Sequence, residues 1–134
     1  MSTITVFLAS SSKVSQRYLD LARELGEQIA ERGHRLVYGG SFVGCMRQLS
    51  EGAKSRNGSV TGVIPERFHA RGIGDLDCEL IVTRNLRDRK QIMEDRADAF
   101  IILPAGLGTL EEFMEILCLR QIGFHQKPIV IIDP

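Results

Sequence analysis

Short apolar runs, many of them β-branched, alternate along the chain with stretches in which apolar residues recur every three or four positions. The short runs predict strands, and the three-to-four spacing is typical of helices that bury one face. We expect a first helix with its apolar face between Tyr18 and Ile29, and we expect the segment Pro65–Cys78 to be a loop. The other expected helices are Val43–Arg56, Asn85–Arg96 and Thr109–Ile122. The expected strands are Ile4–Ala9, Arg35–Tyr38, Val60–Ile64, Glu79–Thr83, Ala99–Leu103 and Pro128–Ile132.

Several of the expected strands are apolar at consecutive positions, as in FIIL (100–103) and IVII (129–132). Such strands are typical of a parallel sheet that helices cover on both faces. The alternation therefore predicts a doubly wound α/β fold, with a mainly parallel, six-stranded, Rossmann-like sheet and helices on both faces. The simplest strand order is 3-2-1-4-5-6. Ligands bind such sheets at the carboxyl ends of the strands, where loops enter the N-termini of helices.

The composition fits one globular domain. The chain has 134 residues, of which 43% are hydrophobic, and this is enough for a core. Its 17 basic and 17 acidic residues cancel, so the charge balance does not indicate a protein that binds nucleic acid or an anionic membrane. The N-terminal run TITVFLA lacks a basic leader and is too short for a signal peptide or a membrane span. We therefore expect a cytoplasmic protein.

The three cysteines are far apart and belong to no C-x-x-C motif. No histidine cluster at zinc spacing accompanies them, so we expect no metal site. We expect Cys45, Cys78 and Cys118 to be reduced and mostly buried, as small hydrophobic residues are.

Two glycine-containing segments fall at the ligand edge of the expected sheet, and neither matches a standard nucleotide motif. PAGLGT (104–109) would continue a dinucleotide fingerprint if a small residue stood at position 111, but Glu111 stands there. YGGSFVG (38–44) has the glycine spacing of a triphosphate loop, but Cys45 and Met46 follow in place of lysine and a hydroxyl residue. These departures argue against an NAD site and against ATP hydrolysis.

PAGLGT (104–109) has glycines that let the backbone approach a ligand, and it leads into a helix whose first free N–H groups favour an anion. A monophosphate fits that description. Thr109 and Glu112 also form the pattern T-x-x-E, a capping box in which the glutamate returns a hydrogen bond to the start of the helix. This stretch by itself leaves both the cap and the active site open.

Arg89 lies four residues before Met93, so it shares the inward stripe of its helix. A guanidinium at this place needs a carboxylate or phosphate partner. An ion pair with Glu112 that ties two helices together fits as well as a binding site. Lys90 fits a solvated helix face or a substrate contact, and Ser10–Ser12 fit a helix-capping turn or a phosphate contact.

The run RKQIMEDRADAFIILPAGLGTLEEF (89–113) resembles the R-K-x-x-M…A-D-A-F-I-x-L-P-G-G-x-G-T-x-x-E signature of the Lonely Guy family. These proteins are cytokinin-activating phosphoribohydrolases, once described as possible lysine decarboxylases. YGGSFVGCM (38–46) resembles the family's Y-G-G-G-x-x-G-L-M, and FLASSS (7–12) resembles its opening strand and serine turn. The resemblance extends over nearly the whole chain.

The resemblance implies an AMP nucleosidase-like enzyme that hydrolyses the N-glycosidic bond of adenosine-type nucleoside 5′-monophosphates and uses no cofactor. The family's essential arginine and glutamate fall on Arg89 and Glu112. The resemblance also implies a homodimer with sites near the subunit interface. The implied substrate-binding positions are Lys90, Gly106, Leu107, Gly108, Thr109 and Glu111, with Gly39, Gly40 and Ser10 from the upstream motifs.

Three residues depart from the family pattern. Ala105 replaces the first glycine of P-G-G, Ser41 replaces the third glycine of Y-G-G-G, and Arg47 follows the methionine where a small residue is usual. Related molybdenum-cofactor carriers bind a nucleotide-like cofactor at a similar edge without cleaving it, so a non-catalytic carrier is the alternative. The chain ends at Pro134, where relatives continue, so we expect residues 1–134 to form one nucleotide-binding domain that is shortened or is a fragment.

Overall fold

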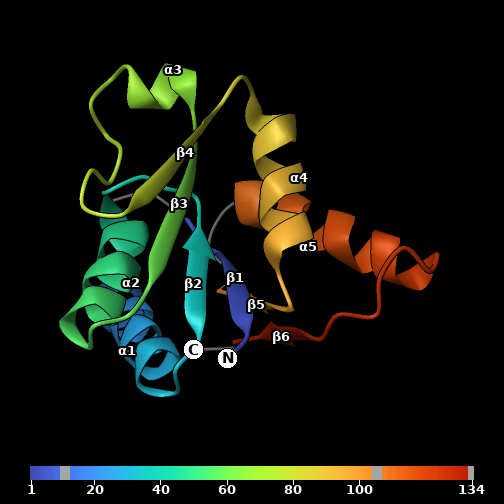
Figure 1. The fold of residues 1–134 in the computed structure, drawn as a ribbon, viewed down its shortest axis with the longest axis horizontal. Coiled ribbons are helices and arrows are strands. Elements are labelled where there is room, and N and C mark those ends of the chain that lie inside the picture. The colour runs from blue at the N-terminus through green and yellow to red at the C-terminus, as the bar shows by residue number, and fades with distance from the viewer. Residues whose placement is uncertain (10–12, 104–106, 133–134) are drawn as a thin grey trace.

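The computed structural model describes residues 1–9, 13–103 and 107–132. Strands and helices alternate through these residues (Figure 1). The strands are β1 (Thr3–Phe7), β2 (Arg35–Tyr38), β3 (Val60–Pro65), β4 (Glu79–Thr83), β5 (Ala99–Ile102) and β6 (Ile129–Ile131). The helices are α1 (Gln16–Glu31), α2 (Gly44–Ser55), α3 (Glu66–His69), α4 (Leu86–Arg96) and α5 (Leu107–Gln121).

The six strands form one parallel sheet in the order β4-β3-β2-β1-β5-β6. The predicted α/β class and the parallel sheet are confirmed, but the predicted order 3-2-1-4-5-6 is wrong. β4 pairs with the outer side of β3, with Thr61 opposite Glu79, instead of with β1. The chain then passes back along α4, and β5 takes the place beside β1. The strand order therefore reverses at β1, where an open α/β sheet usually holds its ligand.

Helices cover both faces of the sheet, as predicted. α1 and α2 lie on one face and α4 and α5 on the other (Figure 1). Neighbouring residues of a strand face opposite layers, so Val6 packs in the core beneath α1 and α2 while Phe7 packs in the core beneath α4 and α5. Leu36 and Val37 divide in the same way. This two-sided burial explains the consecutive apolar residues of the strands.

Two predicted boundaries near the ligand edge are wrong. The segment Pro65–Cys78, expected to be a loop, contains the last residue of β3 and the short helix α3. α5 begins at Leu107, two residues before the expected start at Thr109. The start of α4 agrees with the prediction, because the side chain of Asn85 caps it and accepts a hydrogen bond of 2.8 Å from the Asp88 N–H.

The cysteines are unpaired thiols, but they are not uniformly buried. Cys45 is buried, Cys78 is partly buried and Cys118 is exposed. The prediction of burial is therefore wrong for Cys118, because this residue lies on α5, whose buried side chains in the described ranges are Thr109 and Ile116. None of the described helices is both long enough and apolar enough to cross a membrane.

Candidate active site

A cleft of about 1000 Å³ opens at the carboxyl ends of the strands. Segments that follow the strands β1 to β5 line it, as the doubly wound topology predicts. Most of the residues expected to bind substrate lie on this lining, namely Arg89, Lys90, Leu107, Gly108, Thr109, Glu111 and Glu112. Ser10 and Gly106 lie outside the described residues.

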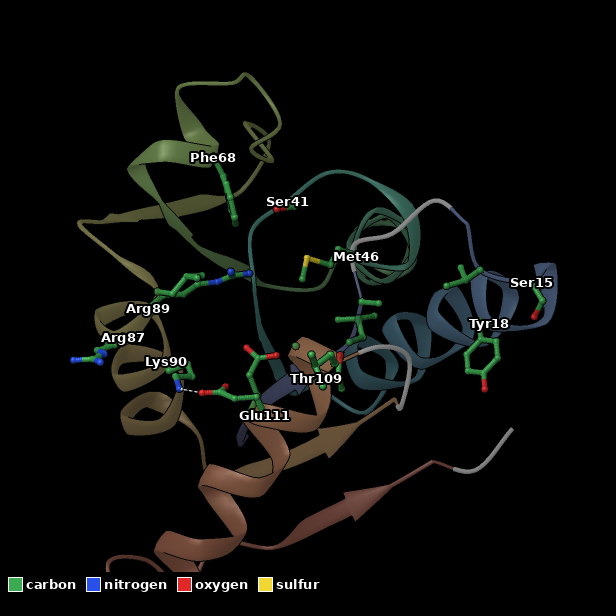
Figure 2. A pocket seen from close by; sticks show the side chains of 17 residues that line it. Ser15, Tyr18, Ser41, Met46, Phe68, Arg87, Arg89, Lys90, Thr109 and Glu111 are labelled. Atoms are coloured by element: carbon green, nitrogen blue, oxygen red, sulfur yellow. Dashed lines mark hydrogen bonds and ion pairs between the residues drawn. The ribbon is translucent and has the colours of Figure 1, made fainter.

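Arg89 is buried on the cleft wall, with 7% of its surface exposed. It reaches from α4 toward the segment that carries Ser41 (Figure 2). Its Nη2 donates a hydrogen bond of 2.9 Å to the carbonyl of Gly39, whereas its Nε has no partner among the described residues. Burial lowers the pKa of Arg89, and the charge of Glu112 opposes that effect. The unsatisfied, buried N–H indicates a place for an acceptor group of a ligand.

Gly39 gives Arg89 the room that this position requires. A Cβ atom at Gly39 would stand 2.0 Å from Nη2 of Arg89 and 2.8 Å from Cε of Met46, so any larger residue would displace both side chains. Gly40 packs against β3, and its φ of +78° favours glycine. Both glycines lie behind the cleft instead of on its described lining.

Glu112 is partly buried on α5 and lines the same cleft. Its pKa is raised to about 7, mainly by burial and also by Glu111 and Glu115, while Arg89 and Lys90 act to lower it. Within the described ranges, neither a salt bridge nor a hydrogen bond joins Glu112 to Arg89. The structural ion pair that the sequence left open is therefore not formed, and both groups remain available to a ligand.

The capping box, one of the two interpretations that the sequence left open at Thr109, is not formed. Thr109 is the third residue of α5 and has 3% of its surface exposed, whereas an N-cap residue precedes the helix. Glu112 consequently lies beyond the first turn of α5, where its side chain cannot cap the N-terminus of the helix. Of the two interpretations of this stretch, the geometry favours the site.

Lys90 joins α4 to α5 through ion pairs and follows Arg89 directly in the chain. Its Nζ contacts the carboxylate of Glu111 (Figure 2) and, at 2.7 Å, that of Glu115. Burial acts to lower the pKa of Lys90, but the hydrogen bonds to these two glutamates outweigh it and raise the pKa. The interpretation of Lys90 as part of a solvated helix face is wrong, because its side chain is only 16% exposed.

The cleft has an apolar wall that was not predicted from the sequence. Tyr18 from α1, Met46 from α2 and Phe68 from α3 line it (Figure 2). Tyr18 was assigned to the buried stripe of its helix, and Phe68 lies in the segment that was expected to be a loop. Such a wall suits a flat, largely apolar group such as a purine base.

A second missed feature is a buried carboxylate behind the cleft. Asp75 has 2% of its surface exposed and accepts hydrogen bonds from Tyr38 at 2.7 Å, Ser50 at 2.5 Å and Lys54 at 2.7 Å. Burial alone would raise the pKa of Asp75, but these three donors lower it. Asp75 lies 37 positions from Tyr38 and 21 from Lys54 in the chain, so no local sequence motif could reveal the group.

The departures from the family pattern differ in their relation to the cleft. Ser41 lines it and forms an isolated antiparallel bridge with Gly74. Arg47 instead forms a salt bridge of 3.1 Å with Glu51 and lies over the ring of Phe42. Ala105 lies outside the described residues.

The sequence matches the family model described as "Possible lysine decarboxylase" over residues 46–134. It is 45% identical over 133 residues to a cytokinin riboside 5′-monophosphate phosphoribohydrolase of Mycobacterium tuberculosis, covering 98% of this chain and 71% of that protein. A protein of the same name from Rhodococcoides fascians is 40% identical over 137 residues, with 98% and 67% covered.

Solved structures with a similar fold carry another description. The molybdenum cofactor carrier protein of Chlamydomonas reinhardtii superposes with a TM-score of 0.80 at 29% identity, covering 98% of this chain and 75% of that one. The molybdenum cofactor binding protein of Rippkaea orientalis superposes with a TM-score of 0.78 at 31% identity, with 97% and 75% covered.

Proposed function

The chain belongs to the Lonely Guy family, and from this premise we propose that it hydrolyses the N-glycosidic bond of adenosine-type nucleoside 5′-monophosphates, releasing the base and ribose 5-phosphate. One observation carries the proposal. A buried arginine with an unsatisfied N–H and a glutamate with a pKa of about 7 line one cleft and are not paired with each other. Neither group is engaged by the other, so both can contact a substrate.

The chemistry needs one anion and one cation. As the bond from C1′ to the base nitrogen breaks, positive charge develops on the ribose and the electron pair leaves with the base. The Glu112 carboxylate stabilises the ribose and orients the water that attacks C1′. The proton from that water ends on the departing base. Arg89 either holds the substrate or stabilises the base as it leaves.

The phosphate is placed at the start of α5. Gly108 and Thr109 lie in the first turn of this helix and line the cleft, and the described first turn contains no acidic residue. Free N–H groups at a helix N-terminus favour an anion. A phosphate could bind the ammonium of Lys90 only by displacing Glu111 and Glu115, which already contact it. Lys90 and Glu111 therefore contact the substrate as an ion pair.

The substrates are AMP and its derivatives that are modified at the exocyclic amine. The apolar wall at Tyr18, Met46 and Phe68 gives a substituent on the base an apolar surface to pack against. The test is incubation of the protein with AMP and with isopentenyl-AMP, followed by an assay for ribose 5-phosphate. Release from at least one compound is expected, and no release from either by the folded protein contradicts the proposal.

The alternative is a carrier that binds a nucleotide-like cofactor without cleaving it. The similarity in fold to the molybdenum cofactor carrier of Chlamydomonas reinhardtii supports it. The two functions differ in what happens to the bound molecule. An intact nucleotide-like compound that co-purifies and stays unreacted favours the carrier, whereas free base that accumulates with time favours the hydrolase.

We also propose that the protein is a cytoplasmic homodimer. Leu110, Met114 and Leu117 recur at helical spacing along α5 and are 52%, 52% and 39% exposed. An exposed apolar stripe of this kind is typical of a subunit interface. The cytoplasmic location agrees with the three unpaired cysteines, since a reducing compartment keeps thiols free.

A further inference from the structure

Asp75 is the centre of a buried polar group behind the cleft, the Asp75 cluster, which comprises Asp75, Tyr38, Ser50 and Lys54. The Asp77 N–H adds a further hydrogen bond of 3.1 Å to the Asp75 carboxylate. The cluster ties the segment after α3 to β2 and α2. A buried carboxylate that is satisfied in this way holds its segment in one position, because any other arrangement would leave a charge unpaired.

The same segment is joined by its backbone to the residues that follow Gly39. The N–H of Asp75 donates to the carbonyl of Gly40 at 2.9 Å, and the N–H of Phe42 donates to the carbonyl of Ile73 at 2.7 Å. Between these two bonds, Ser41 and Gly74 form an antiparallel bridge. The Asp75 cluster therefore fixes residues 40–42, which continue directly from Gly39.

The Gly39 carbonyl is the acceptor that positions Arg89. Among the described residues, the Arg89 side chain makes this one hydrogen bond, from Nη2 to the Gly39 carbonyl. No described carboxylate forms a salt bridge with its guanidinium. A shift of the Gly39 peptide would therefore move the guanidinium within the cleft. We propose that Asp75 is a positioning residue for Arg89, acting through the backbone of residues 39–42; the catalytic consequence rests on the proposed hydrolase function.

The proposal has a readout at Glu112 that does not depend on turnover. Arg89 and Lys90 from α4 lower the pKa of Glu112, and Glu111 and Glu115 from α5 raise it. Of these four charged groups, Arg89 is the one whose position depends on the Asp75 cluster, through the Gly39 carbonyl. Displacement of Arg89 should therefore raise the pKa of Glu112 above about 7.

The experiment compares Asp75→Asn with the parent protein by ¹³C NMR titration of carboxyl-labelled glutamates, with the Glu112 signal assigned by its loss in Glu112→Gln. The titration midpoint of Glu112 is expected to rise. With AMP or isopentenyl-AMP as substrate, kcat/KM is expected to fall on the order of tenfold or more, since small displacements of a catalytic group are costly. Its acidic limb is expected to move to higher pH.

The matched control is Glu27→Gln, which makes the same chemical change in a carboxylate that pairs with Arg23 and Arg56 away from the cleft. It is expected to leave the Glu112 midpoint unchanged. If Asp75→Asn does not fold, Ser50→Ala decides, because it removes one hydrogen bond to the Asp75 carboxylate and leaves the carboxylate itself in place. Its control is Ser55→Ala, whose hydroxyl bonds the carbonyl of Gly52 on the same helix.

A lower melting temperature with an unchanged Glu112 midpoint would show that Asp75 only stabilises the fold, and would overturn the proposal. If the parent protein cleaves neither nucleotide, the hydrolase function fails. The Glu112 titration then still decides whether Asp75 positions Arg89, so the two failures remain distinguishable.

Discussion

At the scale of single residues, the site depends on groups whose surroundings oppose their charged forms. Arg89 is buried with its Nε unpartnered, and burial raises the pKa of Glu112 to about 7. Shifts of this kind are concentrated at functional sites, since the free energy of desolvation is recovered when a ligand supplies the missing partner. The two residues lie on neighbouring helices and line one cleft.

Glu112→Gln tests the carboxylate directly. The amide keeps the size of the side chain but cannot stabilise positive charge on the ribose, so kcat should fall on the order of 10²- to 10⁴-fold. The measurement is release of ribose 5-phosphate, and circular dichroism checks that the fold is intact. Glu24→Gln, an exposed site on α1, is the control and should retain full activity. Normal turnover in Glu112→Gln would remove Glu112 from the mechanism.

The pH dependence follows from the same group. The proposed mechanism uses the ionised form of Glu112, whose pKa is raised to about 7, so kcat/KM should fall as the pH decreases through this value. The substrate phosphate has its second pKa at about 6, which is lower than the midpoint expected for the acidic limb of kcat/KM. The rate profile and the ¹³C titration of Glu112 should share one midpoint. Activity that is constant from pH 8 to pH 5 would contradict the assignment.

At the scale of elements, the contact between α4 and α5 concentrates negative charge around Lys90. Lys90 pairs with Glu111 and Glu115, and Glu94 lies one turn further along α4. Glu94 is 8% exposed, and its Oε1 has no partner in the described structure. Burial, and then Glu115, raise the pKa of Glu94 to about 7.

Glu94→Gln should stabilise the protein in alkaline solution. The pKa of Glu94 in the folded state is above its ordinary value of 4.5, so the folded state loses stability as the pH rises from about 4.5 through about 7. Glutamine removes that loss, and the gain at pH 8 should be on the order of 1 to 3 kcal/mol. Urea unfolding at pH 8 and pH 4.5 measures it, with Glu24→Gln as control. An equal effect at both values of pH would contradict the explanation.

At the scale of the whole molecule, the strand order decides where the cleft lies. With β5 beside β1, α5 begins at the carboxyl edge where the order reverses, while α4 returns from the edge strand β4 across β3, β2 and β1. α5 then extends beyond the sheet (Figure 1), which leaves Leu110, Met114 and Leu117 without cover.

The proposed dimer predicts an effect of charge on this stripe. The double substitution Leu110→Glu and Met114→Glu should give a monomer, because two carboxylates would have to be desolvated in the interface. Light scattering coupled to gel filtration measures the mass. Leu76→Glu, at an equally apolar site that is 82% exposed in another segment, should leave the dimer intact. A monomeric parent protein, or a double variant that remains dimeric, would contradict the interface.

The elements follow from local patterns, so most of them could be predicted. Consecutive apolar positions in β1 and β5 showed strands covered on both faces, and Asn85 marked the start of α4 because an N-cap bonds within its own turn. The segment after β3 was harder, since α3 has four residues and no apolar periodicity. The capping box at Thr109 was wrong because its sequence pattern is also compatible with a helix that starts earlier.

Three conclusions followed from the sequence: the α/β class, the edge of the sheet that carries the cleft, and the proposal that Arg89 and Glu112 carry the chemistry. These depend on neighbours in the chain and on a motif with fixed spacing. Only the tertiary structure decided the strand order, the bond from Arg89 to the Gly39 carbonyl and the Asp75 cluster. Arg89 and Gly39 are 50 positions apart in the chain, and Tyr38 and Asp75 are 37 positions apart. Burial, which sets the pKa of Glu112, exists only once such distant segments have packed.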